Sequence, residues 1–479
     1  MKYTAFVKRD CETCQLVVPV LQELAQHAAV EVLSQDDPAF PEAMGGAGDD
    51  RDLEHSFRAG ITTVPTLIVY AEDSTEADRT EGWDRDAWQA LTHIASLGAD
   101  LRPFQPGCGS RTEDPGMPER LALKYGALEL SARTIEVDAD EDAIEVTYDR
   151  GWSDGLPVVP PTDLRIARML AGTSRAPEEM VGLIPPNLVE CTVEKVAINA
   201  VMAGCRPEYF PVVLTAVEAA LQPEFSMHGL LATLWFSGPV LIVNGPVGRR
   251  IGMNSKGNAL GQGNRANATI GRALQLLIRN VGGGKPQEID RSVLGNPGKY
   301  TFCFAEDESD PGWTPLNVAR GSAPGTSSVT LFHGDGVQGI RAWAARTPEA
   351  LCRSLAEALW SVCHPKVAGW AGAILVLGPD HYGLLRDAGW DRDRLETEIW
   401  QALKRPGQAL VAGAQGIDEG IDPARATEMV DKFNPGYLLI VRAGGQGGGI
   451  SAVIGGWTAQ RRKEQVQIVT RDMSPAHWP

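Results

Sequence analysis

Two cysteines near the N-terminus, Cys11 and Cys14, have the spacing of a pair that carries out thiol chemistry. They follow an apolar run, Tyr3 to Val7, that predicts a strand, and they precede a run over 16–27 whose apolar positions predict a helix. Cysteines at i and i+3 in a helix's first turn share one side and can form a disulfide. Cys11 would lie where the helix dipole and free N–H groups favour the thiolate, the attacking species in exchange. The pattern predicts a redox-active Cys11–Cys14 disulfide.

A second motif, Thr63-Val64-Pro65, opens the apolar run Thr66 to Tyr70. With the cysteine pair, this motif makes residues 1–97 resemble the thioredoxin/glutaredoxin superfamily, in which a proline opening this strand is cis and packs beside the active-site disulfide. The resemblance implies a thioredoxin fold, with Cys11 as nucleophile, Cys14 as resolving thiol and Pro65 as the cis-proline.

Other residues near these motifs refine the resemblance. The Thr-Val-Pro motif, with Gly82 and Asp84 further on, is closer to the glutaredoxin side. Two acidic residues depart from the family pattern, because Asp10 replaces an aromatic residue of thioredoxins and Glu12 lies between the cysteines. Both acids disfavour a nearby thiolate. A metal pair or an inert cysteine pair is the alternative, but a zinc site needs a second ligand pair and 1–97 has none.

Length, charge and hydropathy limit the class of protein. The 479 residues suggest about two to four domains, and 43% are hydrophobic. Lys and Arg total 44 against 61 Asp and Glu, so the net charge is −17, which argues against nucleic acid or an anionic membrane as partner. The chain passes from Met1 into a strand without a signal peptide, and its longest apolar stretch, 230–243, is interrupted by polar residues and Pro239. Eight cysteines form no disulfide framework. We therefore expect a cytoplasmic protein, with a homo-oligomer as its assembly.

A composition change near residue 100 divides the chain. Residues 98–118 are rich in Gly, Pro, Asp and Arg and predict a linker between a domain at 1–97 and a larger one at 119–479. Cys108 lies in this stretch. It is either a shuttle on a flexible tether or an exposed bystander.

The larger part alternates between helical and strand patterns. This alternation favours an α/β fold of unassigned topology, with ligands at the carboxyl ends of strands. The expected helices are 193–203, 212–221, 267–280, 348–362, 391–404 and 424–432, and the expected strands are 240–243, 300–304, 328–332, 373–377 and 437–441.

The densest group of polar residues in the larger part spans Asn254 to Arg272. Glycine lets the backbone approach a ligand, asparagine adds amide donors and acceptors, and arginine binds carboxylate or phosphate. The spacing fits neither a Walker loop nor a dinucleotide fingerprint. We expect a small anionic ligand here, and the alternative is a packed loop whose asparagines satisfy buried backbone. The candidate residues are Asn258, Gly261, Gly263, Asn264, Arg265, Asn267 and Arg272.

Cysteines and histidines of the larger part are further candidates. Cys205 follows the helix expected at 193–203 and adjoins a cation, Arg206, so it is our candidate catalytic thiol there, with Cys363 as a weaker one. Any such cysteine is more often a small buried hydrophobe. Scattered histidines, including His333 and His381, are candidates for acid–base or metal chemistry, but no zinc motif follows residue 100. We assign no metal ligands.

Residues 150–460 also resemble an uncharacterised bacterial family. The resemblance rests on Gly151 to Pro161 (Gly-Trp-Ser-Asp-Gly-Leu-Pro-Val-Val-Pro-Pro), on Ile198 to Cys205 and on the Asn/Gly/Arg loop. We associate that family with small selenocysteine- or cysteine-containing proteins of the UGSC type. The association implies redox or sulfur chemistry and no catalytic residue.

These observations predict a thiol–disulfide oxidoreductase domain fused to a reductase domain that acts on a small sulfur-containing or anionic ligand. The expected partners are a small-molecule substrate, a thiol reductant or reductase, and a small cysteine or selenocysteine protein; no cofactor other than the disulfide is assigned. One alternative is a lyase that cleaves a carbon–sulfur or carbon–metal bond with thiols supplied by the first domain. Another is a metal- or cofactor-binding protein.

Overall fold

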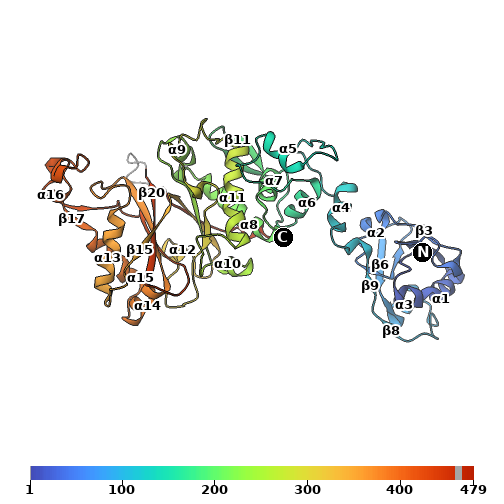
Figure 1. The fold of residues 1–479 in the computed structure, drawn as a ribbon. Coiled ribbons are helices and arrows are strands. Elements are labelled where there is room, and N and C mark those ends of the chain that lie inside the picture. The colour runs from blue at the N-terminus through green and yellow to red at the C-terminus, as the bar shows by residue number, and fades with distance from the viewer. Residues whose placement is uncertain (1, 459–465) are drawn as a thin grey trace. The chain divides into compact units, whose positions relative to one another are not determined.

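The computed structural model describes residues 2–458 and 466–479. The chain forms two compact units, Met1–Glu129 and Leu130–Pro479, and each is described by itself. Both units combine helices with sheets (Figure 1). No helix within the described ranges is long and apolar enough to cross a bilayer.

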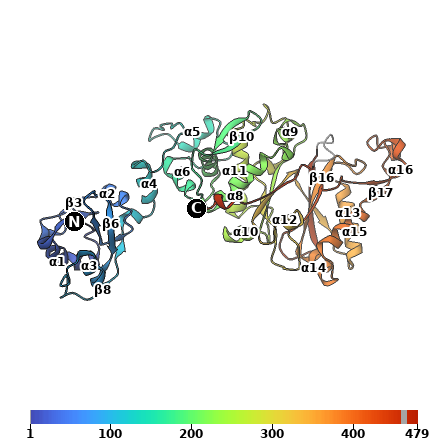
Figure 2. The same ribbon diagram turned by 180° about the vertical axis from the view of Figure 1, so that it is seen from behind.

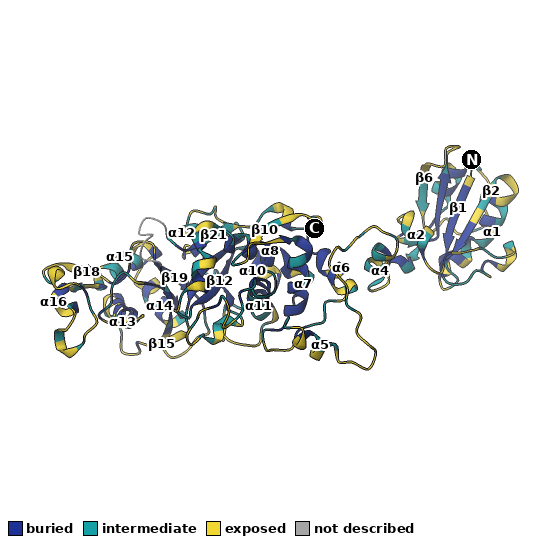
Figure 3. Cartoon of the chain, turned by 90° about the horizontal axis from the view of Figure 1, so that it is seen from above, coloured by how far each residue is buried: buried dark blue, intermediate teal, exposed yellow. Residues whose placement is uncertain are grey.

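A five-stranded sheet in the order β3-β2-β1-β5-β6 forms the centre of the first unit. β1 pairs in parallel with β2, and antiparallel with β5, which in turn pairs antiparallel with β6. β1 is central and buried along nearly its whole length, as Figure 3 shows by its dark blue colour. The strands are β1 Lys2–Val7, β2 Ala29–Ser34, β3 Gly48–Asp49, β5 Thr66–Tyr70 and β6 Glu76–Glu81.

The helix that follows β1 begins four residues earlier than its apolar pattern predicts. Helix α1 spans Glu12–His27, because the Cys11 side chain accepts a hydrogen bond from the Cys14 amide and caps the first turn. Its buried face includes Val17, Leu21 and Leu24. The other helices of this unit are α2 Glu54–Arg58, α3 Arg85–Thr92 and α4 Met117–Lys124.

The segment 98–118, expected to be a linker, belongs to the first unit. Two short antiparallel pairs hold it: β7 with β8, and β4 with β9. Trp83 is fully buried and donates from its indole N–H to the Arg102 carbonyl at 2.7 Å. The division between the units falls at 129/130 instead. The strands are β4 Thr63–Val64, β7 Trp83–Asp84, β8 Phe104–Gln105 and β9 Cys108–Gly109.

The second unit contains two four-stranded mixed sheets, β13-β12-β14-β21 and β15-β20-β16-β19. β12 with β13, and β16 with β19, are the parallel pairs of these sheets. The strands are β12 Gly238–Asn244, β13 Cys303–Ala305, β14 Ser328–Gly334, β15 Val337–Arg341, β16 Ala371–Leu377, β19 Leu438–Arg442, β20 Ile450–Trp457 and β21 Val469–Asp472. Two-stranded pairs add β10 Met180–Ile184 with β11 Val189–Thr192, and β17 Lys404–Pro406 with β18 Met429–Asp431.

Helices cover these sheets. α7 and α11 pack against each other (Figure 1), and α13 packs against α14 and α15 (Figure 2). α7 begins and ends where the sequence predicts, at Val193 and Ala203, because Thr192 caps its start and Gly204, at φ 89°, ends it. The helices are α5 Ala143–Asp149, α6 Asp163–Leu170, α7 Val193–Ala203, α8 Phe210–Ala220, α9 Met227–Ala232, α10 Pro246–Arg250, α11 Arg265–Asn280, α12 Leu316–Ala319, α13 Pro348–Trp360, α14 Pro379–Asp387, α15 Arg392–Ala402 and α16 Gly407–Leu410.

One expected helix, 424–432, is wrong. The segment starts with a short 3-10 turn at Pro423–Arg425 and continues into β18, which pairs antiparallel with β17. Pro423 favours a turn start, and pairing with β17 over Lys404–Pro406 then decides the conformation of Met429–Asp431.

Candidate functional site

The two cysteines of the first motif lie together at the start of α1. Cys11 is the N-cap residue, and its sulfur accepts the Cys14 amide hydrogen at 3.4 Å. Cys11 is 3% exposed and Cys14 is fully buried. The sequence prediction that these thiols share one side of the first helical turn agrees with this geometry.

Pro65 lies where the resemblance places it. The Val64–Pro65 bond is cis, and Pro65 is buried directly before β5. The Cys11 sulfur lies 3.6 Å from the Val64 carbonyl oxygen. The β4–β5 corner therefore forms one wall of the thiol site.

A third thiol, Cys108, completes the cluster. Its sulfur lies 2.7 Å from the Cys11 sulfur, and its side chain is partly exposed. Antiparallel pairing of β9 with β4 sets Cys108 opposite Val64 and so beside Cys11. The linker-like composition of 98–118 predicts that Cys108 is either a shuttle on a flexible tether or an exposed bystander. The structure instead places Cys108 beside Cys11.

Electrostatics divide the three thiols into one thiolate and two neutral groups. The pKa of Cys11 falls to about 5, mainly because the Cys14 thiol donates a hydrogen bond to it. Burial raises this pKa, but hydrogen bonds from the Cys108 thiol and from backbone amides lower it further. Burial raises the pKa of Cys14, and so does its hydrogen bond to Cys11. Burial likewise raises the pKa of Cys108. At neutral pH the Cys11 sulfur is therefore mainly a thiolate, and the other two thiols keep their protons.

The acidic residues Asp10 and Glu12 do not prevent the lowering of the Cys11 pKa. Asp10 and Glu12 are both exposed to solvent, which screens their charge. Across residues 2–458 and 466–479, no three His, Cys, Asp or Glu side chains gather in a way that could hold a metal ion.

The Asn/Gly/Arg loop of the second unit uses its asparagine side chains on its own backbone. Asn258 donates to the Gln262 carbonyl at 2.6 Å, Asn264 caps α11 by accepting the Asn267 amide at 3.1 Å, and Asn267 donates to the Asn254 carbonyl at 2.8 Å. These contacts favour the packed-loop alternative. A Cβ atom at position 261 would clash with the Asn258 side chain, so glycine is needed there. Gly263 has a φ of 111°, a backbone conformation that favours glycine.

The two arginines of this loop are also engaged within the protein. Arg265 donates to the Gly204 carbonyl at 2.9 Å. Arg272 forms a two-pronged ion pair with Asp154 and donates to the carbonyls of Leu156 and Pro157. Arg272 thus holds the 151–161 segment, and binding of an anion by this loop stays a prediction.

Burial disfavours the thiolate form of the candidate thiols in the second unit. Cys205 is 7% exposed, and burial raises its pKa to about 12. Burial also raises the pKa of Cys303, and that of Cys363 although its side chain is exposed. The structure argues against Cys205 as a catalytic thiol because its sulfur stays protonated at neutral pH.

Two candidate histidines of the second unit, His333 and His381, are buried. His333 is 1% exposed, its Nε2 lies 2.6 Å from the Phe225 carbonyl oxygen, and burial lowers its pKa to about 4. His381 is buried, with its Nδ1 2.6 Å from the Ser451 hydroxyl. These two rings form no acid–base pair with a carboxylate among the described hydrogen bonds and ion pairs.

Polar residues do gather at the carboxyl ends of β12, β13 and β19. Glu306 accepts hydrogen bonds from Asn244 and Trp313, and its pKa is raised by burial. Asp307 pairs with Arg442 and with Lys256, and its amide donates to the Arg442 carbonyl at 2.7 Å. This network joins the ends of the two sheets by internal contacts.

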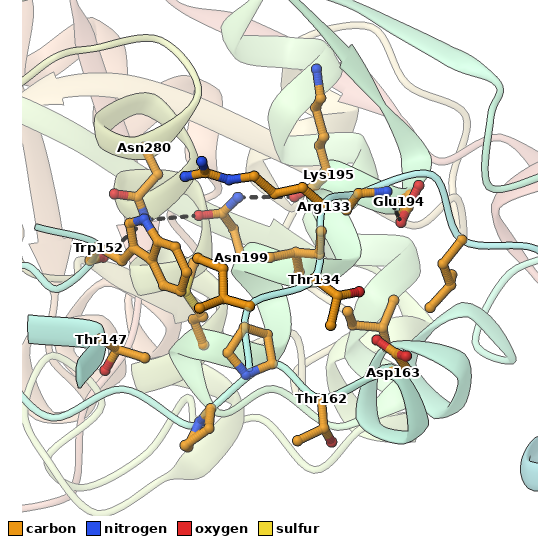
Figure 4. Close-up of a pocket in the computed structure, with 18 of the residues that line it drawn as sticks. Arg133, Thr134, Thr147, Trp152, Thr162, Asp163, Glu194, Lys195, Asn199 and Asn280 are labelled. Atoms are coloured by element: carbon orange, nitrogen blue, oxygen red, sulfur yellow. Dashed lines mark hydrogen bonds between the residues drawn. The ribbon is translucent and has the colours of Figure 1, made fainter. Parts of the chain in front are cut away.

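A cavity of about 980 Å³ lies elsewhere in the second unit (Figure 4). Its walls come from residues 130–137, from α5, from the 160–166 stretch, from α7 and from the end of α11. Most lining side chains are apolar, such as Ile135, Val146, Ile198 and Met202. A cavity of this volume and character suits a small organic ligand.

A few polar groups occur on its wall. Figure 4 shows Asn280 hydrogen-bonded to Asn199 at 3.1 Å, and Asn280 also donates to the Trp152 carbonyl at 3.0 Å. The Asn280 Oδ1 is buried without a hydrogen-bond partner in the described structure. Arg133 lines the same cavity with an exposed side chain. The site therefore offers a mainly apolar volume whose wall also carries two cations, Arg133 and Lys195, and two carboxylates, Asp163 and Glu194.

Sequence reasoning missed this cavity and the place of Cys108. In the sequence, Trp152 stands out only as part of the Gly151 to Pro161 run that carries the family resemblance, and residues 130–147 carry no motif. An apolar lining drawn from segments as distant as Ile135 and Val281 gives no local pattern that could reveal it.

Comparisons with known proteins assign no family. No family model matches the chain, and no curated protein matches it. A solved structure, thioredoxin 1 from the thermophilic eubacterium Thermosipho africanus TCF52B, matches 21% of this chain and 100% of that chain, at 19% identity and a TM-score of 0.15. A likeness at that score carries no argument, so the description of the first unit rests on its own strand order and thiol geometry. The resemblance of 150–460 to the UGSC-associated family stays a prediction.

Proposed function

We propose that the first unit is a thiol–disulfide oxidoreductase in which Cys11 attacks and Cys14 resolves. The observation that carries the proposal is the geometry of the thiols: Cys11 caps the start of α1, Cys14 lies in the same turn, and the Cys108 sulfur is 2.7 Å from the Cys11 sulfur. A nucleophilic sulfur beside a second sulfur in the same helical turn is the arrangement that disulfide exchange needs.

The proposed cycle has three steps. The Cys11 thiolate attacks one sulfur of a substrate disulfide, forms a mixed disulfide and releases the other substrate sulfur as a thiolate. Cys14 then loses its proton to the released thiolate and attacks the Cys11 sulfur, which frees the second substrate sulfur as a thiolate and leaves a Cys11–Cys14 disulfide. An external thiol reductant returns two electrons and one proton to the pair, which restores the Cys11 thiolate and the protonated Cys14 thiol.

A single-turnover experiment tests this function. Fully reduced full-length protein is mixed with one equivalent of an aromatic disulfide whose thiolate is coloured. We expect a rapid phase that releases two coloured thiolates per probe molecule in the wild type and is lost in Cys11→Ser. Cys352→Ala, which removes a buried thiol of α13, is the matched control and should keep the rapid phase. A rapid phase that survives in Cys11→Ser contradicts the proposal.

For the second unit we propose binding of a small, mainly apolar molecule in the cavity beside Asn280. The cavity's volume and its mainly apolar lining support this. Cys205 is a buried, free thiol, which is already reduced and accepts no electrons, so we propose a bound ligand as the electron acceptor in this unit. The reductase assignment for residues 119–479 depends on such a ligand containing oxidised sulfur.

Two measurements decide between reductase and lyase. Native mass spectrometry of the purified full-length protein, compared with Ile198→Trp, tests whether a ligand leaves when the cavity is filled. With that ligand identified, the number of reducing equivalents that the full-length protein consumes per turnover separates the reactions, because a lyase needs no electrons and a reductase does. Retained ligand in Ile198→Trp contradicts binding in this cavity.

A further inference from the structure

The position of Cys108 is built by several contacts along its segment. Its neighbour Gly109 pairs with Thr63, and the Ser110 amide donates to the Thr62 carbonyl at 2.9 Å. On the helix side, the Thr13 hydroxyl donates to the Pro106 carbonyl at 2.6 Å. The segment is therefore fixed to β4 and to α1 at once.

Glycine at 107 permits this close approach. A Cβ there would lie 2.4 Å from the Thr63 Cγ2 and 2.9 Å from the Val64 carbonyl oxygen. Gly82 faces it, and a Cβ at 82 would lie 2.8 Å from the Gly107 nitrogen. Gly82 and Gly107 thus allow the backbone around Gly107 to pack closely against Thr63, Val64 and Gly82. This packing places Cys108 beside the Cys11 sulfur.

The three thiols differ in how solvent reaches them. Cys11 is 3% exposed and Cys14 is fully buried, whereas Cys108 is partly exposed. An extended strand on an edge is also the way in which many proteins bind a peptide, and β9 occupies the edge of β4 with a cysteine opposite Val64. β9 is thus arranged as a substrate strand that the chain itself supplies.

We propose that Cys108 is a third exchanging thiol, which forms a disulfide with Cys11 in alternation with Cys14. The sulfur–sulfur separation of 2.7 Å is about 0.7 Å longer than a disulfide bond, roughly 2.05 Å, so a small side-chain rotation brings the two sulfurs to bonding distance. The proposal rests on the proposed exchange function of Cys11.

The exchange balances without a further reagent once the pair has been oxidised by a disulfide substrate. The Cys108 sulfur, as it loses its proton, attacks the Cys11 sulfur of the Cys11–Cys14 disulfide. The Cys11–Cys108 bond forms, the Cys11–Cys14 bond breaks, and Cys14 leaves as a thiolate that takes up the proton. No electrons are gained or lost, and the disulfide moves from an enclosed pair to one with a partly exposed sulfur, where a thiol reductant can reach it.

The test uses full-length Cys14→Ser and one equivalent of the coloured aromatic disulfide. Cys11 releases one coloured thiolate by forming the mixed disulfide, and Cys108 then releases the second. We expect two equivalents from Cys14→Ser, with a Cys11–Cys108 link in the peptide map, and one equivalent from Cys14→Ser/Cys108→Ser, with the second release slowed at least tenfold. Cys14→Ser/Cys352→Ala should behave as Cys14→Ser does.

The outcomes separate this proposal from the function on which it rests. One equivalent from Cys14→Ser, with the probe retained on Cys11, overturns the third thiol while leaving Cys11 as nucleophile. No release from Cys11 in any variant, the wild type included, overturns the exchange function itself. A measurement without substitutions gives a second check: acid-quenched, partly oxidised wild-type protein should contain both the Cys11–Cys14 and the Cys11–Cys108 links, and absence of the second overturns the proposal.

Discussion

The strongest quantitative prediction concerns the Cys11 thiolate and the neighbours that stabilise it. A cysteine in an unfolded chain has a pKa of about 8.5, so a value of about 5 is a shift of about 3.5 units. At about 1.36 kcal/mol per unit, the site favours the thiolate by about 4.8 kcal/mol. A hydrogen bond to a charged group contributes about 1.5–3 kcal/mol, so removing one donor should raise the pKa by about 1–2 units.

The perturbations are Cys14→Ala and Cys108→Ala. We expect the larger rise in the Cys11 pKa for Cys14→Ala, because the Cys14 thiol is the principal donor, and a smaller rise for Cys108→Ala. The assay is the rate of alkylation of Cys11 by iodoacetamide between pH 4 and 10, followed on the Cys11 peptide of reduced full-length protein. A wild-type midpoint at or above pH 8, or a midpoint that neither substitution moves, refutes the reasoning.

The same shift makes stability depend on pH. The folded pKa of Cys11 lies below the unfolded one, so the stabilisation is complete above about pH 8.5 and is lost as the pH falls to about 5. Of the roughly 4.8 kcal/mol at most, about 2.7 kcal/mol remains at pH 7. Urea unfolding of the reduced protein should show this trend, and Cys11→Ala should flatten it. An unchanged pH slope in Cys11→Ala contradicts the linkage.

Three further substitutions test separate parts of the structure. Gly107→Ala would place a methyl group against the Thr63 side chain, so we expect the 104–110 segment to lift and alkylation of Cys11 at pH 7 to speed several-fold; an unchanged rate contradicts the close packing. Arg272→Met leaves Asp154 without its partner in a mostly buried pair, so urea unfolding should show a loss of about 3 kcal/mol, and a loss below about 1 kcal/mol means that the pair is not structural. His333 has a folded pKa of about 4, below the unfolded value of about 6.5, so the unfolded state binds more protons and stability falls by up to about 3.4 kcal/mol from pH 6.5 to 4; His333→Gln should remove that fall, and an equal fall in the variant refutes the assignment.

Local structure follows the sequence closely where apolar periodicity and caps agree. The helix 193–203 is found at the residues expected, because its capping threonine and terminal glycine are local signals. The first strand and the position of the cysteine pair are equally predictable, because the strand, the capping cysteine and the helix follow one another in the sequence. The structure of 424–432 is less predictable from the sequence. Pro423 starts a turn, and pairing with β17 makes residues 429–431 a strand rather than the expected helix.

Contacts between distant residues explain the remaining differences. Gly107 and its neighbours have the composition of a linker, and only the close approach to Thr63 and Gly82 shows that the glycine serves packing. The sulfurs of Cys11 and Cys108 meet across 97 positions of sequence, which no local pattern encodes. An asparagine side chain can bind either a ligand or the backbone of its own loop, and the sequence does not distinguish these two roles. The hydrogen bonds of Asn258 and its neighbours favour the second role.

The most direct test of the central claim is a disulfide map of the full-length protein after oxidation. Fully reduced protein receives one equivalent of a small disulfide, is quenched in acid, alkylated and digested, and its linked peptides are sequenced. The account predicts that Cys11 is the residue oxidised first, linked to Cys14 or to Cys108. A map in which Cys11 stays free while Cys205 or another second-unit cysteine is oxidised contradicts it.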